Sequence, residues 1–461
     1  MKQDTQFLET EKLSKLMLRF SVPCVLSLLV GALYNIADQI FIGNSELSTL
    51  GNAATGVVFP FFIIAQAFAW CVGDGCAAYL NICQGRRDSE NAHKAMGSGI
   101  TVTLASSVLL IALFCPFKIP LLTLFGASEN SLGMAVEYFN IVIAFFPLYM
   151  LSNTMNSMVR ADGSPRWAML SMLAGAVTNI VLDPLFIFAF RWGMTGAALA
   201  TVIGQTVSFL MTALYFFKSK TFRLTLKSFV PDFRVFVMPL KLGASSFITQ
   251  MTIVVIAVLS NVMLAKYGAA SSYGADIPIA VMGIENKVFT VVINIVVGII
   301  LGCQPIVSYN MGSRNYGRVK RLYGCVMACT LIIGIAATLV FELAPDAVVR
   351  MFGTPTNIPN PEEYWIFAEK TFRVFLSLII LTLITKMTSV FFQAAGRPIM
   401  AIIASMIRDI VCFVPLIIIL PMYFGLDGIL YAAPIADFVS AVITAVLIYR
   451  FFTELKREAL R

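Results

Sequence analysis

The hydrophobic positions of this chain form long runs that are separated by short polar segments. Each run is long enough to cross the ~30 Å hydrocarbon core of a bilayer as a helix. The runs do not alternate with a period of two, as the strands of a membrane β-barrel do. The pattern predicts an all-α polytopic membrane protein with twelve transmembrane helices, at approximately residues 16–42, 52–82, 94–116, 134–159, 166–190, 194–217, 236–265, 277–303, 318–342, 364–393, 399–421 and 425–450.

Composition and the placement of charge agree with this class and indicate an orientation. Hydrophobic residues make up 59% of the chain and charged residues 13%, about half the charged share of a soluble domain. Most of the 33 lysines and arginines lie in segments on the N-terminal side of the predicted membrane. The positive-inside rule then predicts that both termini are cytoplasmic. The net charge of +8 is explained by these basic loops, without a nucleic-acid partner.

The chain is predicted to consist of two six-helix halves that repeat each other. A polar, basic segment divides it into an N-terminal lobe (1–217), a linker (218–235) and a C-terminal lobe (236–461). Because six is an even number, both halves enter the membrane from the same side, and a pseudo-two-fold axis along the membrane normal relates them, with a substrate site expected between them. Four motifs recur in order, at offsets of 227 to 233 residues: Gln84–Asp88 with Met311–Asn315, Leu124–Gly126 with Met351–Gly353, Arg160–Pro165 with Gln393–Pro398, and Trp192–Gly196 with Phe424–Gly428.

The residue types disfavour an enzyme and a metal protein. His93 is the only histidine, and the nine cysteines form no CxxC pair, so neither a metal site nor a disulfide framework is expected. The chain contains no Walker A motif, so ATP is not expected to drive it directly, and no cofactor is predicted. An integral membrane transferase is a distant alternative, because it would need an acid–base set that His93 alone does not supply.

Ionisable residues within the predicted spans are distributed unequally between the halves. The N-terminal half contains Asp38, Asp74 and Asp183 and no base. An unpaired carboxylate in low dielectric takes up a proton or binds a cation, and both outcomes suit a coupling-ion site. Asn179 lies one helical turn before Asp183, and Pro184 leaves a backbone carbonyl near Ile180 without its donor.

The C-terminal half has matched charges: Glu285, Asp409 and Asp437 against Lys287, Lys386 and Arg408. These residues are predicted to form a polar network, which either stabilises the fold as buried ion pairs or re-pairs between states as a gate or relay. Glu285 and Lys287, like Arg408 and Asp409, do not share a helix face, so we expect partners from other spans.

The sequence resembles a known family, the multidrug and toxic compound extrusion (MATE) transporters, especially their MepA-like bacterial branch. The resemblance covers nearly the whole chain. It is carried by Tyr34–Gly43 (YNIADQIFIG), Arg160–Pro165 (RADGSP), Asn179–Pro184 (NIVLDP), Gly196–Leu199 (GAAL) and Pro305–Gly312 (PIVSYNMG).

The resemblance implies two lobes that form a V-shaped cleft, and a cation site in the N-terminal lobe. Its acids would be Asp38 and Asp183, and the supporting polar residues would be Tyr34, Asn179, Thr201 and either Asn153 or Asn156, of which we take Asn156. Some relatives rely on an acid in the seventh span. Residues 236–265 contain none, which puts a cation site of that kind in doubt.

The predicted function is secondary export of lipophilic, cationic compounds by alternating access, in exchange for H⁺ or alternatively Na⁺. By resemblance we expect a monomer in a bacterial plasma membrane, surrounded by lipid and binding small molecules. A flippase for lipid-linked oligosaccharides or cell-wall precursors is the runner-up. It would need cationic residues to hold pyrophosphate, and only the C-terminal half offers them.

Overall fold

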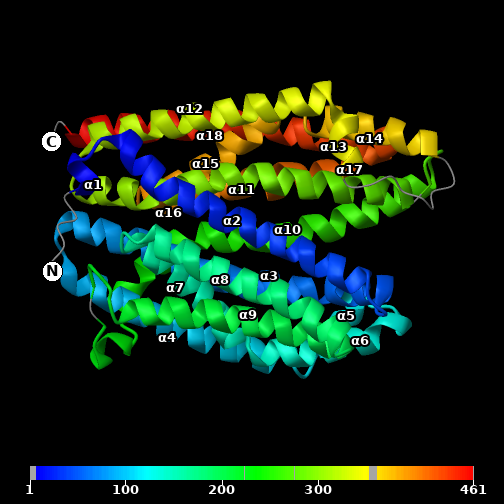
Figure 1. Ribbon diagram of the computed structural model, residues 1–461. Helices are drawn as coiled ribbons and strands as arrows, with labels where there is room; N and C mark the ends of the chain where they lie inside the picture. Colours follow the sequence, from blue (N-terminus) through cyan, green and yellow to red (C-terminus); the bar gives the residue numbers. More distant parts are fainter. Residues whose placement is uncertain (1–6, 223, 275, 352–360, 460–461) are drawn as a thin grey trace. The chain divides into compact units, whose positions relative to one another are not determined.

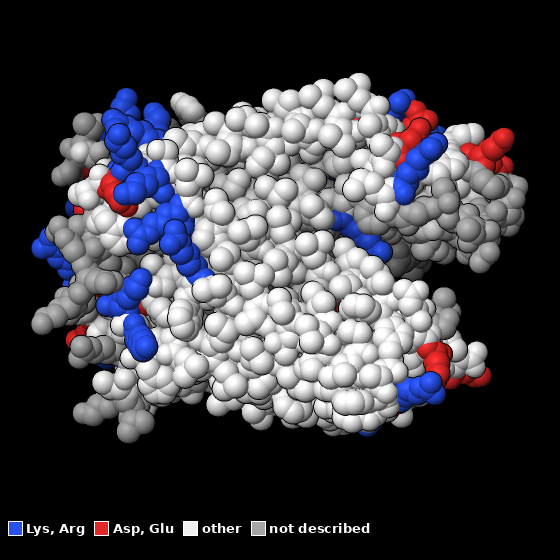
Figure 2. Space-filling view, viewed as in Figure 1, with Lys and Arg blue, Asp and Glu red and all other residues white. Residues whose placement is uncertain are grey.

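In the computed structural model, which describes residues 7–222, 224–274, 276–351 and 361–459, the chain is helical and these residues form no strand. Ten of its helices are long and apolar enough to cross a membrane. Two bent helix pairs bring the number to twelve if each pair counts as one span. Lysine and arginine side chains gather near helix ends, while the middle of the visible surface is almost free of charge (Figure 2). The predicted all-α polytopic fold is confirmed.

The chain packs into two compact units, and the first comprises residues up to Gln250 together with Leu301–Asn315 and Gln393–Pro398. Its α-helices, labelled in Figure 1, are α1 (Phe7–Thr10), α2 (Leu13–Gly43), α3 (Ser48–Arg86), α4 (Ser89–Phe114), α5 (Lys118–Leu124), α6 (Glu129–Ala144), α7 (Phe146–Ala161), α8 (Pro165–Pro184), α9 (Gly193–Phe216) and the first part of α10 (Phe233–Ala269). It also contains the π-helix η1 (Leu185–Ala189) and the 3₁₀ turn η2 (Leu226–Phe229).

The second unit comprises Met251–Ile300, Tyr316–Phe392 and the residues from Ile399 onward. It holds the rest of α10 and most of α11 (Asp276–Gly312), followed by α12 (Tyr316–Leu343), α13 (Pro345–Arg350), α14 (Pro361–Phe375), α15 (Ile379–Ala394), α16 (Pro398–Met406), the π-helix η3 (Ile407–Phe413), α17 (Val414–Phe424) and α18 (Leu426–Ala459). These units describe packing. The division into lobes at residues 218–235 concerns chain order and stays a prediction.

Three of the repeated motifs have a positive φ at corresponding residues in both halves. Arg87 follows the end of α3 and has a φ of 61°, and Arg314 lies just beyond the end of α11 and has a φ of 60°. Gly163 and Gly396 have φ of 78° and 75°, and Gly193 and Gly425 have φ of 56° and 59°. Left-handed backbone is rare for a residue with a side chain, so the arginine pair is a specific match. The remaining pair, Leu124–Gly126 and Met351–Gly353, cannot be compared, because Phe352 and Gly353 lie outside the described residues.

Irregular helix geometry also recurs at corresponding places. The pair α6 and α7 is bent by 57°, and the pair α14 and α15 by 50°. The π-helix η1 interrupts the fifth predicted span directly after Pro184, and η3 interrupts the eleventh. Short π segments inside α-helices are frequent at functional sites. The prediction that Pro184 disturbs its helix is consistent with this change from α to π geometry.

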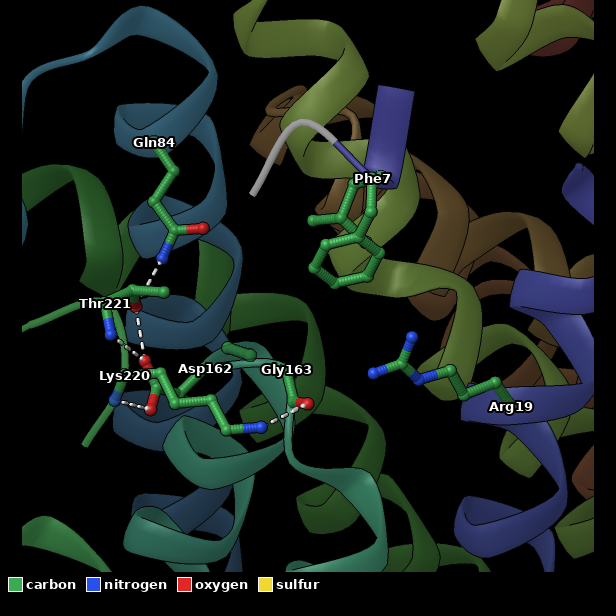
Figure 3. A pocket seen from close by; sticks show the side chains of 9 residues that line it. Phe7, Arg19, Gln84, Asp162, Gly163, Lys220 and Thr221 are labelled. Atoms are coloured by element: carbon green, nitrogen blue, oxygen red, sulfur yellow. Dashed lines mark hydrogen bonds between the residues drawn. The ribbon is translucent and has the colours of Figure 1, made fainter. Parts of the chain in front are cut away.

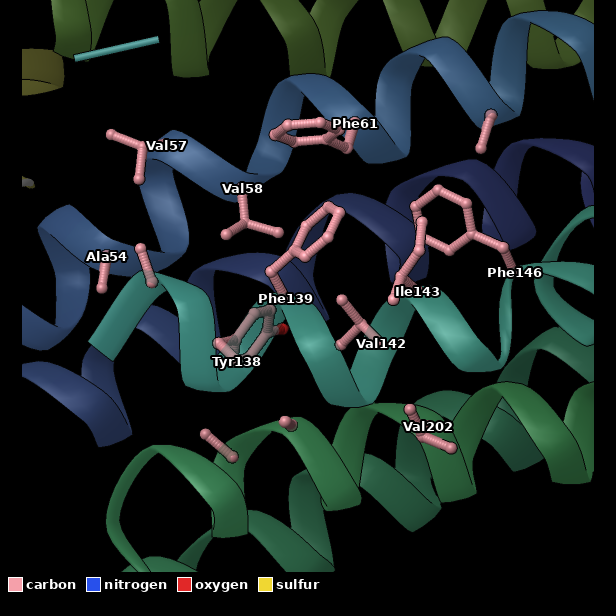
Figure 4. Packing of buried hydrophobic residues seen from close by; sticks show 14 of the residues in the cluster. Ala54, Val57, Val58, Phe61, Tyr138, Phe139, Val142, Ile143, Phe146 and Val202 are labelled. Carbon is pink, nitrogen blue, oxygen red and sulfur yellow. The ribbon is translucent and has the colours of Figure 1, made fainter. Parts of the chain in front are cut away.

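An aromatic core holds α3, α4 and α6 of the first unit together. The Phe61 ring meets Phe114, Phe125 and Phe139 edge to face, at centroid distances of 5.0, 5.1 and 4.9 Å. In Figure 4, Phe61 of α3 and Phe139 of α6 point toward one another, with Val58 and Tyr138 beside them. Such pairs stabilise by about 0.5–1.5 kcal/mol each beyond the area they bury. This packing fixes α6, which carries Tyr138 to the candidate site.

Helices α3 and α10 approach each other closely because glycines face the contact. A Cβ at Gly75 would overlap the carbonyl oxygen of Pro239, and a Cβ at Gly243 would overlap that of Cys71. Small residues at helix contacts let two membrane helices approach to backbone distance. The contact brings Ser246 of α10 to Asp74 of α3, at 3.0 Å.

We expect Gly243→Val to lower the melting temperature of the purified protein, because the added side chain separates α3 from α10. Overpacking of this kind costs about 1–3 kcal/mol. Gly283→Ala in α11 is the matched control, since a Cβ there meets nothing within 4 Å. Thermal unfolding followed by tryptophan fluorescence in detergent measures both variants. Equal melting temperatures for the two would contradict the close α3–α10 contact.

Candidate functional site

The two acids predicted for the cation site, Asp38 of α2 and Asp183 of α8, lie side by side in the first unit. Their carboxyl groups are close enough to interact directly with each other. Asp183 is 0% exposed and Asp38 is half-buried. Within the described part of the chain, both oxygens of Asp183 and Oδ1 of Asp38 lack a hydrogen-bond partner. Two carboxyl groups in contact at low dielectric cannot both stay ionised without a counter-charge.

Two of the supporting residues, Tyr34 and Asn179, lie beside this pair, and a third, Thr201, contacts a neighbour of the pair. Asn179, one turn before Asp183 on α8, lies against its carboxyl group and is 3% exposed. Tyr34, one turn before Asp38 on α2, accepts a hydrogen bond from Nε2 of Gln205 (3.4 Å). The hydroxyl of Thr201 pairs with that of Tyr138 at 3.4 Å. We call Tyr34, Asp38, Tyr138, Asn179, Asp183, Thr201 and Gln205 the carboxylate pair site.

Two members of this site were not predicted, namely Tyr138 of α6 and Gln205 of α9. Tyr138 is within electrostatic range of Asp38, Asp183 and Tyr34. Each is a single polar residue in an apolar run, which periodicity does not distinguish from a packing residue. Gln205 lies one turn after Thr201 on the same face of α9, and this position is the one signal in the sequence that points to it.

Asn156 lies in a different cluster. Its Nδ2 donates to the carbonyl of Ala168 (2.9 Å) and to Ser171 (3.2 Å), and its Oδ1 accepts from Nη1 of Arg160 (2.7 Å). These hydrogen bonds tie α7 to α8. The structure therefore gives Asn156 partners that differ from those of the carboxylate pair site.

Asp74 corrects the prediction that the acids of the N-terminal half have no basic partner. Nη2 of Arg160 lies 3.4 Å from Oδ1 of Asp74, and Ser157 and Ser246 donate to the same carboxylate at 2.8 and 3.0 Å. Arg160 stands at the end of α7, and its long side chain reaches back along the helix to α3. Ser246 also accepts from Gln393 (3.1 Å). Asp74 is thus a buried acid that is paired with a base.

Asp162 anchors the segment that leads into the linker (Figure 3). Its carboxylate accepts from the backbone N–H groups of Lys220 (2.7 Å) and Thr221 (2.8 Å), from the hydroxyl of Tyr215 (2.6 Å) and from that of Thr221. Burial raises the pKa of Asp162 above its ordinary value, although these hydrogen bonds favour the ionised form and oppose the shift. Phe7, Arg19 and Gln84 line the small cavity beside it.

We expect Asp162→Asn to release this segment and to speed trypsin cleavage after Lys218 and Lys220. An asparagine has one acceptor oxygen where the aspartate has two, and its NH2 group would face one backbone N–H and one hydroxyl that now donate to the aspartate. Leaving a buried donor without a partner costs about 1–3 kcal/mol. Asp232→Asn is the control in the same connection, because the hydrogen bond described for the Asp232 carboxylate is a local one, from the N–H of Arg234. Mass mapping of the tryptic peptides compares the two, and equal cleavage rates would contradict the anchor.

The acids and bases of the second unit form a chain of ion pairs. Nε of Arg408 lies 2.8 Å from Oδ1 of Asp437 on α18, and its Nη1 lies 3.0 Å from Oδ1 of Asp409. Lys386 of α15 binds the other oxygen of Asp409. We call these four residues the four-charge network. Arg408 and Asp409 were expected to find partners on other spans, and each has one: Asp437 of α18 and Lys386 of α15.

Two details of the predicted network need correction. Arg408 and Asp409 do pair with each other, although they are adjacent in sequence, because the guanidinium folds back within the π-helix η3. Glu285 and Lys287 lie outside the ion-pair chain. Lys287 is exposed, whereas Glu285 is 0% exposed and both its carboxyl oxygens lack a hydrogen-bond partner among the described residues.

Comparison with known proteins places this geometry in context. The MatE family model matches residues 23–185 and 245–419. The multidrug export protein MepA of Staphylococcus haemolyticus (strain JCSC1435) is 26% identical over 448 residues, which cover 96% of this chain and 95% of that protein.

Two solved structures share the fold over essentially the whole chain. A MATE crystal structure in the bent conformation superposes with a TM-score of 0.90 at 24% identity, covering 100% of both chains. An outward-facing multidrug resistance MATE transporter of the MOP superfamily gives a TM-score of 0.88 at 24% identity, covering 99% of this chain and 100% of that one.

Proposed function

Because this chain belongs to the MatE family, and is therefore a transporter and not an enzyme, we propose that it exports lipophilic, mainly cationic compounds in exchange for H⁺. Na⁺ is the alternative coupling ion. The multidrug export named for the staphylococcal relative supports the substrate class. Small-molecule substrates and the bilayer are the only partners that this function requires.

The observation that carries the proposal is the contact between Asp38 and Asp183. A buried pair of carboxyl groups without a basic partner among the described residues holds either a shared proton or a monovalent cation. Tyr34, Asn179 and Thr201 add neutral oxygens around the pair, as a proton or Na⁺ site requires. Of the three acids in the N-terminal spans, Asp74 is the one that pairs with a base in the described residues, namely Arg160 at the end of α7.

Coupling follows from the charge of this site. With one proton bound, the pair carries a single negative charge, and with two it is neutral. Each step changes which hydrogen bonds the carboxyl groups donate and accept toward α8 and α2. A ligand shifts a two-state equilibrium only through its different affinity for the two states. Antiport results if the cationic compound favours the deprotonated state and protons favour the other.

The orientation and assembly belong to the same proposal. Basic loops on the N-terminal side favour cytoplasmic termini, and the bacterial relatives favour a bacterial plasma membrane. Division into two lobes at residues 218–235 places the carboxylate pair site in the N-terminal lobe. We propose that one chain is sufficient for transport.

The flippase alternative is weakened by the ion pairs of the C-terminal half. It would need cationic side chains that are free to hold a pyrophosphate group. Lys386 and Arg408, two of the three bases in the spans of the C-terminal half, are already bound to Asp409 and Asp437. Only Lys287 is left, and a single cation is a weak site for a doubly charged group.

Ethidium efflux from proteoliposomes tests the proposal. An imposed pH gradient, acidic on the side toward which the drug leaves, is expected to accelerate efflux several-fold over protein-free liposomes, and an ionophore that collapses the gradient is expected to remove the acceleration. Acceleration by an imposed Na⁺ gradient instead would identify Na⁺ as the coupling ion. Efflux that responds to neither gradient would overturn the proposal.

A further inference from the structure

Glu285 of α11 is an isolated buried acid in the second unit. It is 0% exposed, and both of its carboxyl oxygens are buried without a hydrogen-bond partner among the described residues. The charged groups that act on it are Arg408 of η3 and Asp437 of α18. Arg408 is in turn paired with Asp409 of η3, which is paired with Lys386 of α15. Lys287, two residues along α11, is exposed.

The four-charge network is balanced without Glu285. Arg408 and Lys386 supply two positive charges, and Asp409 and Asp437 supply two negative charges. Arg408 already uses Nε for Asp437 and Nη1 for Asp409, and its guanidinium lies 5.9 Å from the ring centre of Phe289 and 5.6 Å from that of Phe413. Glu285 is therefore a fifth ionisable group, and among the described residues it has no counter-charge and no donor of its own.

An ionised carboxylate in this position is costly. The effective cost of burying an unpaired charge is several kcal/mol, whereas a neutral carboxyl group without a hydrogen bond costs about 1–3 kcal/mol. Among the groups around it, only Arg408 is close enough to compensate an ionised Glu285. Asp437 and Asp409 take up two of the five N–H donors of the guanidinium, so an ionised Glu285 would compete with these two carboxylates for its positive charge.

We propose that Glu285 is a proton-binding site, protonated in the arrangement described here, whose ionisation draws Arg408 from Asp437 to Glu285. Arg408 lies in a π-helix, a geometry in which the helix carries one extra residue in a turn and can change the direction of its side chains. The proton site thus acts on the junction of α11, η3 and α18. It lies in a different unit from the carboxylate pair site. The Glu285 site would add a second proton to the proposed antiport, and this part of the inference rests on the proposed function.

Infrared difference spectroscopy of the purified protein tests the proton directly, without any transport. At neutral pH, the wild type minus Glu285→Gln spectrum is expected to contain a protonated-carboxyl band, which disappears at alkaline pH. Asp183→Asn supplies a reference difference spectrum for the carboxylate pair site. A difference spectrum that contains only a carboxylate band, or one that responds to Na⁺ and not to pH, would overturn the proposal. Failure of antiport would leave this readout unchanged, so the two proposals fail separately.

The variant also tests the second proton in transport. Glu285→Gln mimics the protonated form, so we expect it to fold and to bind ethidium like the wild type. The protons moved per ethidium are expected to fall to about half, whereas Asp183→Asn stops coupled transport. An unchanged proton-to-drug ratio in Glu285→Gln would contradict the inference. Glu342→Gln, at an acid of α12 that lies outside the four-charge network, controls for the loss of a carboxyl group in the same half.

Discussion

Asp183→Asn is expected to remove the several-fold, gradient-driven acceleration of ethidium efflux and to leave efflux at the level of protein-free liposomes. The variant keeps the size of the side chain, but it cannot exchange a proton or supply a negative charge to the carboxylate pair site. Asp183 is buried, and its side-chain neighbours Asp38 and Asn179 belong to the carboxylate pair site, so the amide changes contacts of the site and not of the surrounding fold. The efflux assay in proteoliposomes measures the effect.

Glu46→Gln is the control for this variant, because Glu46 is an exposed acid of the same half. Size-exclusion profiles and melting temperatures check that both variants fold. Asp38→Asn is expected to match Asp183→Asn, and the double variant to be no worse than either, since residues that act as one unit are not additive. Full gradient-driven efflux in Asp183→Asn would remove Asp183 from the coupling mechanism.

Arg408→Met is expected to destabilise the protein more than any surface substitution, by about 3–5 kcal/mol. The change leaves Asp437 without its ion-pair partner and Asp409 with Lys386 alone, both in a buried environment. Lower yield of folded protein and a lower melting temperature measure the loss. Combining Arg408→Met with Asp437→Asn is expected to restore part of the stability, because it removes the unpaired charge.

Arg373→Met is the matched control for the Arg408 variant. Arg373 also forms an ion pair, with Glu369 one turn earlier at 2.8 Å, but both side chains are exposed by more than 40%. Exposed pairs of this kind contribute at most about 1 kcal/mol. If the Arg408 variant were as stable as the Arg373 variant, the four-charge network would not hold the second unit together.

The sequence predicted the elements of this protein well, because lipid imposes strong constraints on them. A span must be a continuous apolar run, so its position is visible from hydropathy alone. The repeat was visible because turn geometry needs particular residues. Gly163 and Gly396 mark left-handed turns at the same point of each half. Asp38 and Asp183 could be singled out, because an acid in a membrane span requires a reason.

Contacts that depend on side-chain reach were less predictable. Arg160 follows a span in sequence and was assigned to a loop, but its side chain extends back to Asp74. Arg408 and Asp409 were expected to point apart on an α-helix, and the π-helix lets them pair. Tyr138 reaches the carboxylate pair site only because the aromatic core around Phe61 places α6 there. Each case depends on a tertiary arrangement that local sequence does not encode.

The most direct test of the account is to let the drug drive the ion. Proteoliposomes are loaded with ethidium and a pH-sensitive dye, at equal pH on both sides and with the membrane voltage clamped. The account predicts that ethidium leaving down its own gradient acidifies the lumen, and that Asp38→Asn and Asp183→Asn abolish the acidification. Ethidium efflux that depends on the protein but moves neither H⁺ nor Na⁺ in the opposite direction would contradict it.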